Sequence, residues 1–278
     1  MDFDGRKRTR GPGDERLLMN ICFITASNNE EVLRSSLLAS PDLAGVEVNV
    51  QRGAPSAGVA YNRGIQSSRA EIMVFVHQDI YLPKGWLAKL EKALAQLERQ
   101  DPNWGVLGLF GTEPDGTGQG LLYSTGLGVV LGSEFEGARP VRTLDEVMLI
   151  VRRASGLRFD ETLEGFHLYG ADISLEAESR GMKCYAISAH CIHNTNGIGL
   201  LPWAYWKCYL RLRRKWSSRL PVSTPCMDIT RWGMPALNYL LRRPVWLLRH
   251  RHRLGRRVPD PSPVWRQLQT KELASQTA

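Results

Sequence analysis

The stretch VFVHQDIYLPKGW, residues 74–86, joins an apolar run to a polar turn and then to the start of a helix. Residues 71–76 (EIMVFV) predict a buried strand, because a short apolar run bounded by polar residues is typical of one. That run ends abruptly at His77, Gln78 and Asp79. A carboxylate held at the end of a rigid strand suits Mg²⁺ or Mn²⁺, which prefer oxygen ligands shared with substrate phosphates. An ordinary polar turn explains the same residues, so this stretch alone leaves both interpretations open.

Strands and helices are predicted to alternate on either side of this stretch. The expected strands are residues 19–24, 46–50 and 104–110, and the expected helices are residues 30–39, 55–69 and 86–100. Such alternation predicts an α/β fold with a Rossmann-like, mostly parallel sheet and helices on both faces. Ligands of such sheets bind beyond the carboxyl ends of the strands. We therefore expect the site to form from residues 25–28, 51–53 and 77–79.

The second half of the predicted domain has a different pattern. Residues 111–140 are rich in glycine without a helical period, which indicates loops and a hairpin at LLYSTGLGVVL. A strand is expected at 146–153, a helix at 170–181 and a last strand at 183–188. This last strand leads into a short segment that ends at His193.

Charge divides the chain more sharply than hydrophobicity does. The 278 residues are 43% hydrophobic, which is enough for a sizeable core, and the net charge is +8. Residues 201–258 hold fourteen Lys and Arg and one acid, Asp228, so the rest of the chain is mildly acidic. Five cysteines without a CxxC pair argue against a disulfide framework and favour a reducing, cytoplasmic compartment.

These patterns predict four parts. Residues 1–16 are charged, have no apolar core of a secretory signal, and are expected to be a disordered arm. A catalytic or binding domain is expected at 17–200, a basic, aromatic helical appendage at 201–258 and a tail at 259–278. The sequence contains no window of 18 apolar residues, so no transmembrane helix is expected.

The region around Asp79 resembles the acid-x-acid element of GT-A glycosyltransferases, in the His-Gln-Asp form of a glycosyltransferase-like branch close to family 2. Three other pieces are similar to that family in order and spacing. They are the turn Thr25-Ala26-Ser27-Asn28, the segment GVAYNRGIQSSRAE at 58–71, and the segment FHLYGADISLEAESRGMKCYAISAHCIHNTNG at 166–197. The resemblance covers about residues 19–197 and implies a GT-A fold and a metal-dependent sugar transferase.

The resemblance also implies roles for the matching residues. Nucleotide-sugar contacts are implied for Thr25, Ala26, Asn28, Gln51, Asn62, Arg63, His77 and Gln78, with His77 at the ribose. Asp79 and His193 would bind Mn²⁺ or Mg²⁺, and Asp172 would be the general base of an inverting transfer to an acceptor hydroxyl. Two positions depart from the family: His77 replaces an acid, and Ala171 replaces a frequent Glu before Asp172.

Several roles keep an alternative at this stage. Asp172 also suits the N-terminus of a helix simply as an acid favoured by the helix dipole. Asp145 and Glu146 are the second choice for the base. His190, Cys191 and His193 together offer three zinc ligands. Residues so crowded at a strand end cannot all point inward, so a zinc site is disfavoured.

The resemblance implies a nucleotide-sugar donor, a UDP-sugar in the first place, and a glycan or lipid-linked acceptor. Residues 201–257 mix tryptophan with Lys and Arg, which suits the surface of an anionic membrane and favours a peripheral position on its inner face. Nucleic acid is a less favoured partner, and a helical subdomain packed on the sheet is the plain alternative.

Two other functions fit the same fold. One is a nucleotide- or nucleic-acid-binding protein without catalysis, which would bind a nucleotide but not turn over a nucleotide sugar. The other is a nucleotidyltransferase, which is disfavoured because no Gly-rich loop with a trailing Lys follows the first strand. Asp79 separates an active transferase from a binding protein, because only the transferase needs its carboxylate for turnover.

Overall fold

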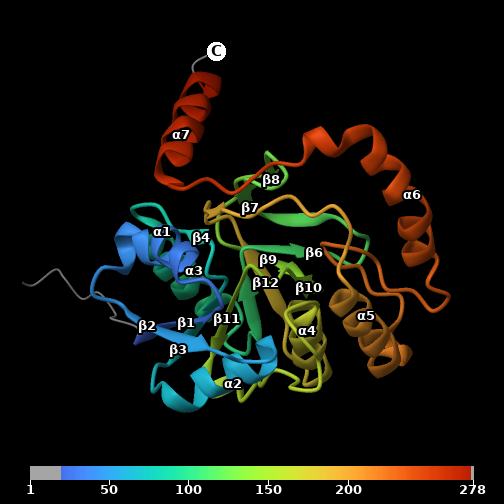
Figure 1. Cartoon of the computed structure of the whole chain (residues 1–278). Coiled ribbons are helices and arrows are strands. Elements are labelled where there is room, and N and C mark those ends of the chain that lie inside the picture. Colours follow the sequence, from blue (N-terminus) through green and yellow to red (C-terminus); the bar gives the residue numbers. More distant parts are fainter. Residues whose placement is uncertain (1–19, 277–278) are drawn as a thin grey trace, which may run out of the picture.

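The computed structural model describes residues 20–276 and contains the predicted alternation of strands and helices (Figure 1). The arm predicted at residues 1–16 lies outside the described residues. The strands are β1 (Ile21–Ser27), β2 (Glu47–Arg52), β3 (Ile72–Val76), β4 (Ile80–Tyr81), β5 (Val106–Gly108), β6 (Phe110–Thr112), β7 (Gly118–Ser124), β8 (Val129–Gly132), β9 (Ala138–Val141), β10 (Thr143–Leu144), β11 (Met148–Arg152), β12 (Cys184–Ile187) and β13 (Ile192–His193). The helices are α1 (Glu30–Ser35), α2 (Ala57–Ser67), α3 (Trp86–Gln100), α4 (Tyr169–Ser179), α5 (Trp203–Lys215), α6 (Met234–His250) and α7 (Ser262–Gln276).

The larger sheet has the strand order β2-β1-β3-β11-β5-β12-β9. β1 runs parallel to β2 and β3, and β5 runs parallel to β12, as the α/β pattern predicts. β11 lies between β3 and β5 and is antiparallel to both, and β9 is antiparallel to β12. The strand expected at 104–110 is therefore not the direct neighbour of the strand that ends at His77.

The direction of β11 follows from how the chain reaches it. A parallel neighbour needs a crossover connection, which is usually a helix. The chain between β5 and β11 forms strands of the second sheet, the edge strand β9 of the large sheet and no helix, so β11 enters the large sheet from the opposite end. The expected hairpin is present in this connection, where Leu122 pairs with Leu131 across the antiparallel strands β7 and β8.

The second sheet has the strand order β10-β6-β7-β13-β4, with β8 also paired to β7. Its short strands β4 and β13 are antiparallel and place Ile80 opposite His193. β4 begins directly after Asp79, and β13 ends at His193. This sheet therefore brings the end of the third strand next to a residue from the far end of the domain.

Helices cover both faces of the large sheet, as predicted. One apolar cluster includes Ile24 and Phe75 together with residues of α2, α4 and α5, and the other includes Phe23 and Val74 together with residues of α3. Neighbouring residues of one strand enter opposite clusters because successive side chains of a strand point to opposite faces. At Gly64 in α2, a larger side chain would collide with Ile24, so this glycine allows the helix to pack closely on the sheet.

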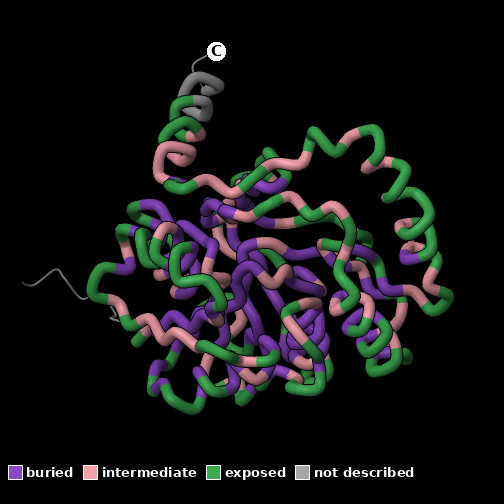
Figure 2. Tube along the Cα trace, viewed as in Figure 1, coloured by how far each residue is buried: buried purple, intermediate pink, exposed green. Residues whose placement is uncertain are grey.

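The helices after residue 200 differ in how they contact the domain. α5 packs into the core through Tyr205, Cys208, Tyr209 and Leu212. The tube of α6 is mostly exposed in Figure 2, and Figure 1 shows α6 arching beside the sheets and α7 projecting from them. Among residues 20–276, no helix has both the length and the apolar character needed to cross a membrane.

Candidate metal centre and donor cleft

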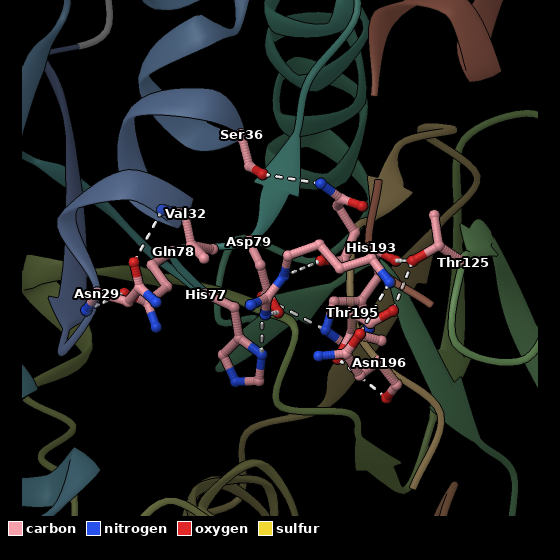
Figure 3. Close-up of polar contacts among 12 residues, drawn as sticks. Asn29, Val32, Ser36, His77, Gln78, Asp79, Thr125, His193, Thr195 and Asn196 are labelled. Atoms are coloured by element: carbon pink, nitrogen blue, oxygen red, sulfur yellow. Dashed lines mark hydrogen bonds and ion pairs between the residues drawn. The ribbon is translucent and has the colours of Figure 1, made fainter. Parts of the chain in front are cut away.

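Three side chains, those of His77, Asp79 and His193, meet where β3 and β13 end (Figure 3). One nitrogen of each histidine and one carboxylate oxygen lie within 4.8 Å of one another. His193 Nε2 is 3.5 Å from Asp79 Oδ1, and His77 Nδ1 is 4.0 Å from the same oxygen. Two imidazole nitrogens and a carboxylate oxygen around one point are a donor set that suits divalent transition metals. The three residues therefore fit a metal ion.

Main-chain hydrogen bonds hold these residues in place. The His77 N–H donates to the Val147 carbonyl at 3.1 Å, and the Asn194 N–H donates to the Asp79 carbonyl at 2.8 Å. The Thr125 N–H donates to the His193 carbonyl at 3.0 Å, which ties β13 to the end of β7. The backbone of two sheets thus brings the three side chains together.

The charges of this group are strongly coupled. Burial alone would raise the pKa of the Asp79 carboxyl, but His193, His77 and Arg257 outweigh burial and hold that pKa well below its usual range. Burial lowers the pKa of the His77 imidazole. Burial would also lower the pKa of His193, but the Asp79 carboxylate outweighs it and the pKa of His193 is raised. The Asp79 carboxyl is therefore ionised at neutral pH.

Tyr169 fixes the orientation of the His77 ring. The Tyr169 O–H donates to the Glu146 carbonyl at 3.0 Å, and the same oxygen lies 2.8 Å from His77 Nε2. Because a carbonyl only accepts, the single Tyr169 proton is used there, and Tyr169 accepts the proton of His77 Nε2. The lone pair of His77 is then on Nδ1, the atom that faces Asp79. A metal-binding histidine commonly has its other nitrogen held in this way.

A segment from the far end of the chain completes the site. Arg257 Nη2 donates to Asp79 Oδ2 at 3.0 Å, and Arg257 Nε donates to the Asn194 carbonyl at 2.8 Å. Asn194 and the main chain of Val258 exchange two hydrogen bonds of 2.8 Å each. The Asp79 carboxylate therefore presents one oxygen to the histidines and the other to a fixed cation.

A cleft of about 480 Å³ adjoins the three metal-binding candidates. This volume is within the range of about 300–1,000 Å³ that is usual for small-molecule sites. The cleft is lined by Ala26, Ser27, Asn28, Gln51, Gly53, Ala54, Tyr61, His77, Gln78, Asp79 and Phe166. Most of these residues stand at the carboxyl ends of β1, β2 and β3, which is where the sequence predicts the site.

Gln78 joins two of the strand ends. Its Oε1 accepts hydrogen bonds from Ser27 Oγ at 2.8 Å and from the main-chain N–H groups of Asn28 and Asn29 at 3.2 Å each. Its Nε2 donates to Asn28 Oδ1 at 2.7 Å. The loop after β1 is thus attached through Gln78 to the turn that carries Asp79.

Three residues with an implied nucleotide contact are not among those that line the cleft. Asn62 is buried and clamps the main chain of Phe159, accepting from its N–H at 3.0 Å and donating to its carbonyl at 2.9 Å. Arg63 is exposed on α2. Thr25 is fully buried within β1. Their contacts with a nucleotide stay predictions.

Asp172 lies in the first turn of α4 and contacts α5 and the residue that follows it. Its carboxylate accepts from Lys215 Nζ at 2.9 Å and from Trp216 Nε1 at 2.7 Å, and the residue is 3% exposed. Burial raises the pKa of Asp172 against the opposing effect of Lys215. The structure does not bring Asp172 to the three metal-binding candidates, and its role as base stays a prediction.

Glu146, one of the second choices for the base, lies before β11 and is half-buried. Burial, and then the neighbouring Asp145, raise the pKa of the Glu146 carboxyl to about 8. Asp145 acts electrostatically on both His77 and His193. These two acids therefore stand in the electrostatic neighbourhood of the metal-binding candidates.

Sequence reasoning missed Tyr169, Arg257 and the use of His77 as a possible metal ligand. Tyr169 lies three residues before Asp172 in a segment that the motif already covered, so its position was a usable signal. Arg257 lies among many arginines in a stretch with no motif, and nothing there distinguishes it from its neighbours.

The profile of the glycosyltransferase-like family matches residues 22–200. The chain belongs to this family. The match includes β1, the cleft, the turn at Asp79 and His193, and it confirms the resemblance that the motifs carried. Helices α5 to α7 of this glycosyltransferase-like protein lie after the residues that the family profile matches.

One curated relative of this glycosyltransferase-like chain is the protein named ATP synthase subunits region ORF 6 from Fuscovulum blasticum. The two are 33% identical over 137 residues, which are 47% of this chain and 54% of the relative. The chain therefore spans about half the length of this relative.

Solved structures with some similarity to the chain include three transferases or transferase complexes. GalNAc-T7 with UDP, GalNAc and Mn²⁺ has 13% identity and a TM-score of 0.47 over 70% of this chain and 42% of that one. The mannosyltransferase PcManGT from Pyrobaculum calidifontis with GDP-Man and Mn²⁺ has 13% identity and a TM-score of 0.43 over 82% and 69%. TarS from S. aureus with UDP-GlcNAc has 16% identity and a TM-score of 0.42 over 63% and 58%.

Proposed function

We propose that this chain transfers a sugar from a nucleotide-sugar donor to an acceptor hydroxyl in a metal-dependent reaction. The observation that carries the proposal is the meeting of His77, Asp79 and His193 at the edge of a cleft built from parallel strand ends. A site of this kind is where α/β sheets bind nucleotides. Membership of the glycosyltransferase-like family supports sugar transfer as the reaction.

The donor set favours Mn²⁺ over Mg²⁺. Mg²⁺ prefers an octahedron of oxygen ligands, whereas divalent transition metals also accept imidazole nitrogens, and among these metals Mn²⁺ shares with Mg²⁺ the preference for carboxylate and phosphate oxygens. His77 and His193 each offer one nitrogen, and Asp79 offers Oδ1. A metal ion bound there would neutralise charge on the diphosphate that leaves with the nucleotide.

The nucleotide is proposed to occupy the cleft beside this group. Asn28 and Gln51 line it with amide groups that suit the edges of a base, and Phe166 offers an aromatic face. A UDP-sugar is the first expected donor. Gln78 holds Ser27 and Asn28 in position and so shapes the wall on which the nucleotide would lie.

Arg257 is proposed to bind the diphosphate. Its guanidinium already lies 3.0 Å from Asp79 Oδ2, and such a group offers several donors to phosphate oxygens. A fixed cation beside the leaving diphosphate stabilises the charge that develops there.

The acceptor is proposed to be a hydroxyl of a glycan or of a lipid-linked sugar, and the reaction to invert the anomeric centre. Such a reaction needs one base in reach of the acceptor hydroxyl. Asp172 is the base that the resemblance implies, and Glu146 is the second candidate because its carboxyl has a pKa of about 8. The chain is proposed to work at the inner face of a membrane.

Nucleotide release from a panel of nucleotide sugars, with Mn²⁺, with Mg²⁺ and with chelator, tests this proposal. We expect release with Mn²⁺ that exceeds release with Mg²⁺ and that Asp79→Asn abolishes. Asp115→Asn, on an exposed turn of the second sheet, is the matched control and should retain the rate. Nucleotide affinity without any release, unchanged in Asp79→Asn, would instead support a binding protein without catalysis.

A further inference from the structure

α6 carries an apolar stripe that no other described part of the chain covers. The side chains of the stripe are Met234, Leu237, Leu241, Val245 and Leu248, and Trp232 stands just before the helix. Leu241 is 66% exposed, Leu248 is 89% exposed and Trp232 is 81% exposed. Their spacing of three or four residues places the helical members on one side of the helix.

The opposite side of α6 attaches the helix to the domain. Ala236, Tyr239, Arg243 and Trp246 recur with the same helical spacing but half a turn away from the stripe. The Tyr239 hydroxyl accepts from the Leu201 N–H at 3.0 Å, and Arg243 donates to the Gly199 and Ile198 carbonyls at 2.9 and 2.8 Å. The inner side thus satisfies the contacts with the protein, and the outer stripe is left for another partner.

The charges around the stripe indicate what that partner is. Between Arg231 and Arg257 the sequence has eight arginines and no acidic residue. Arg242 and Arg249 are exposed and lie along one flank of the stripe, and Arg251 and Arg253 follow its end. A leucine-rich side bordered by arginines is the pattern of helices that lie in the headgroup layer of an anionic bilayer.

We propose that α6 docks on an anionic lipid surface, with the stripe inserted between lipids and the flanking arginines on their headgroups. This inference rests on, and deepens, the proposed function at a membrane. A nucleic acid would pair with the arginines but offers no partner for exposed leucines. The helix is attached to the domain and has arginines within it, so it lies on the surface and does not cross it.

Docking through α6 would hold the donor cleft at the lipid surface. The segment before α5, which Arg243 binds, begins five residues after His193, and the chain after α6 returns to Asp79 through Arg257. The chain after the docking helix therefore leads to Asp79, and the inner side of the helix is bonded to the segment that follows His193. This places the surface where a lipid-linked acceptor would be presented.

Flotation of the full chain with lipid vesicles tests the proposal without any turnover. We expect the chain to float with vesicles of phosphatidylcholine and phosphatidylglycerol and to bind pure phosphatidylcholine at least about tenfold more weakly. Leu241→Glu with Leu248→Glu should lower binding to the anionic vesicles by at least about tenfold, because two charges enter the inserted face. Leu38→Glu, an exposed leucine near the first helix, is the matched control and should bind as the unchanged chain does.

Two further measurements distinguish a lipid surface from a soluble partner and from a second copy of the chain. Lipids labelled in the acyl chain should quench the part of the tryptophan fluorescence that Trp232→Phe removes, which a soluble complex would not produce. Absence of flotation, equal flotation of the double variant, or a dimer in light scattering that the double variant dissolves would overturn the proposal. Because none of these measurements needs a donor sugar, they are independent of the outcome of the nucleotide-release assay.

Discussion

Arg257 and Asp79 form an ion pair of 3.0 Å between residues that lie 178 positions apart in the sequence. The guanidinium occupies Oδ2 of the carboxylate, and Oδ1 is left facing the two histidines. The arginine therefore compensates the charge of the carboxylate without filling the position between the histidines. It also repels a metal ion and attracts a diphosphate, so its effects on the two ligands have opposite signs.

Arg257→Ala separates these effects. We expect Mn²⁺ alone to bind a few times more tightly, because a neighbouring positive charge is removed. We expect UDP in the presence of Mn²⁺ to bind about tenfold more weakly, since a hydrogen bond to a charged group contributes about 1.5–3 kcal/mol. Titration calorimetry measures both affinities. Arg256→Ala, at an exposed neighbour, is the control, and the same change in that variant would contradict a specific role for Arg257.

His77→Ala tests whether this histidine binds metal or only nucleotide. The resemblance implies a ribose contact, whereas the hydrogen bond with Tyr169 leaves Nδ1 facing Asp79. We expect Mn²⁺ binding in the absence of nucleotide to weaken at least about tenfold, as for the loss of one of three ligands. Free Mn²⁺ is measured by its electron paramagnetic resonance signal. Gln78→Ala is the contrasting variant, because it should weaken UDP binding and leave Mn²⁺ binding unchanged. Unchanged Mn²⁺ affinity in His77→Ala would restrict His77 to the nucleotide.

Asp172→Asn is expected to destabilise the chain, whether or not Asp172 is the base. The oxygen of the asparagine amide still accepts from Trp216, but its NH₂ group faces the Lys215 ammonium, and both of these groups are donors. Lys215 is therefore left partly unpaired in a buried site. Removing one partner of a buried ion pair lowers the free energy of unfolding by about 3 kcal/mol. The expected loss is at most this large here, because Lys215 keeps its contact with Asp160. Urea unfolding of the variant and of the unchanged chain measures this difference in the free energy of unfolding.

Turnover in the same variant decides the other role. Activity is compared well below the unfolding midpoint, with Lys215→Met as a control that breaks the same contact from the other side. A base role predicts that Asp172→Asn loses turnover and that Lys215→Met retains most of it. Equal retention in both variants would limit Asp172 to attaching α4 to α5.

The sequence predicted the parts of the site that depend on local pattern. The apolar run of β3 and its polar end identify Asp79, and the carboxyl ends of parallel strands identify the cleft. The direction of β11 could not be read, because an apolar strand has the same composition in either direction. The missing helix between β5 and β11 was the one available signal.

Contacts between distant segments account for the rest. Arg257 reaches Asp79 where Asn194 binds the main chain of Val258, and neither Arg257 nor Val258 belongs to a motif. The position of Asp172 against Lys215 depends in the same way on how α5 packs on α4. Side-chain chemistry at positions 172 and 257 was visible in the sequence, but their partners were not.

Glu146→Gln is expected to change how stability depends on pH. Burial, and then Asp145, raise the pKa of the Glu146 carboxyl to about 8, whereas a glutamate in an unfolded chain titrates near about 4.3. A raised pKa in the folded state means that this group stabilises the fold at low pH and loses that contribution as the pH rises through the folded value. Gln imitates the protonated acid at every pH. The melting temperature of the variant minus that of the unchanged chain should therefore increase from about pH 5 to about pH 8, and this difference should stay constant at higher pH.

Glu31→Gln, at an exposed position in the first turn of α1, is the control, and its difference from the unchanged chain should be the same throughout the range. A flat difference for Glu146→Gln would show that its carboxyl ionises in the folded chain as it does in the unfolded one. The same property bears on catalysis, because a base takes a proton only when it is ionised. If Glu146 is the base, turnover rises with pH until about pH 8 and is lost in Glu146→Gln. Turnover that is retained in this variant, with the pH profile of the unchanged chain, would leave the base role to Asp172.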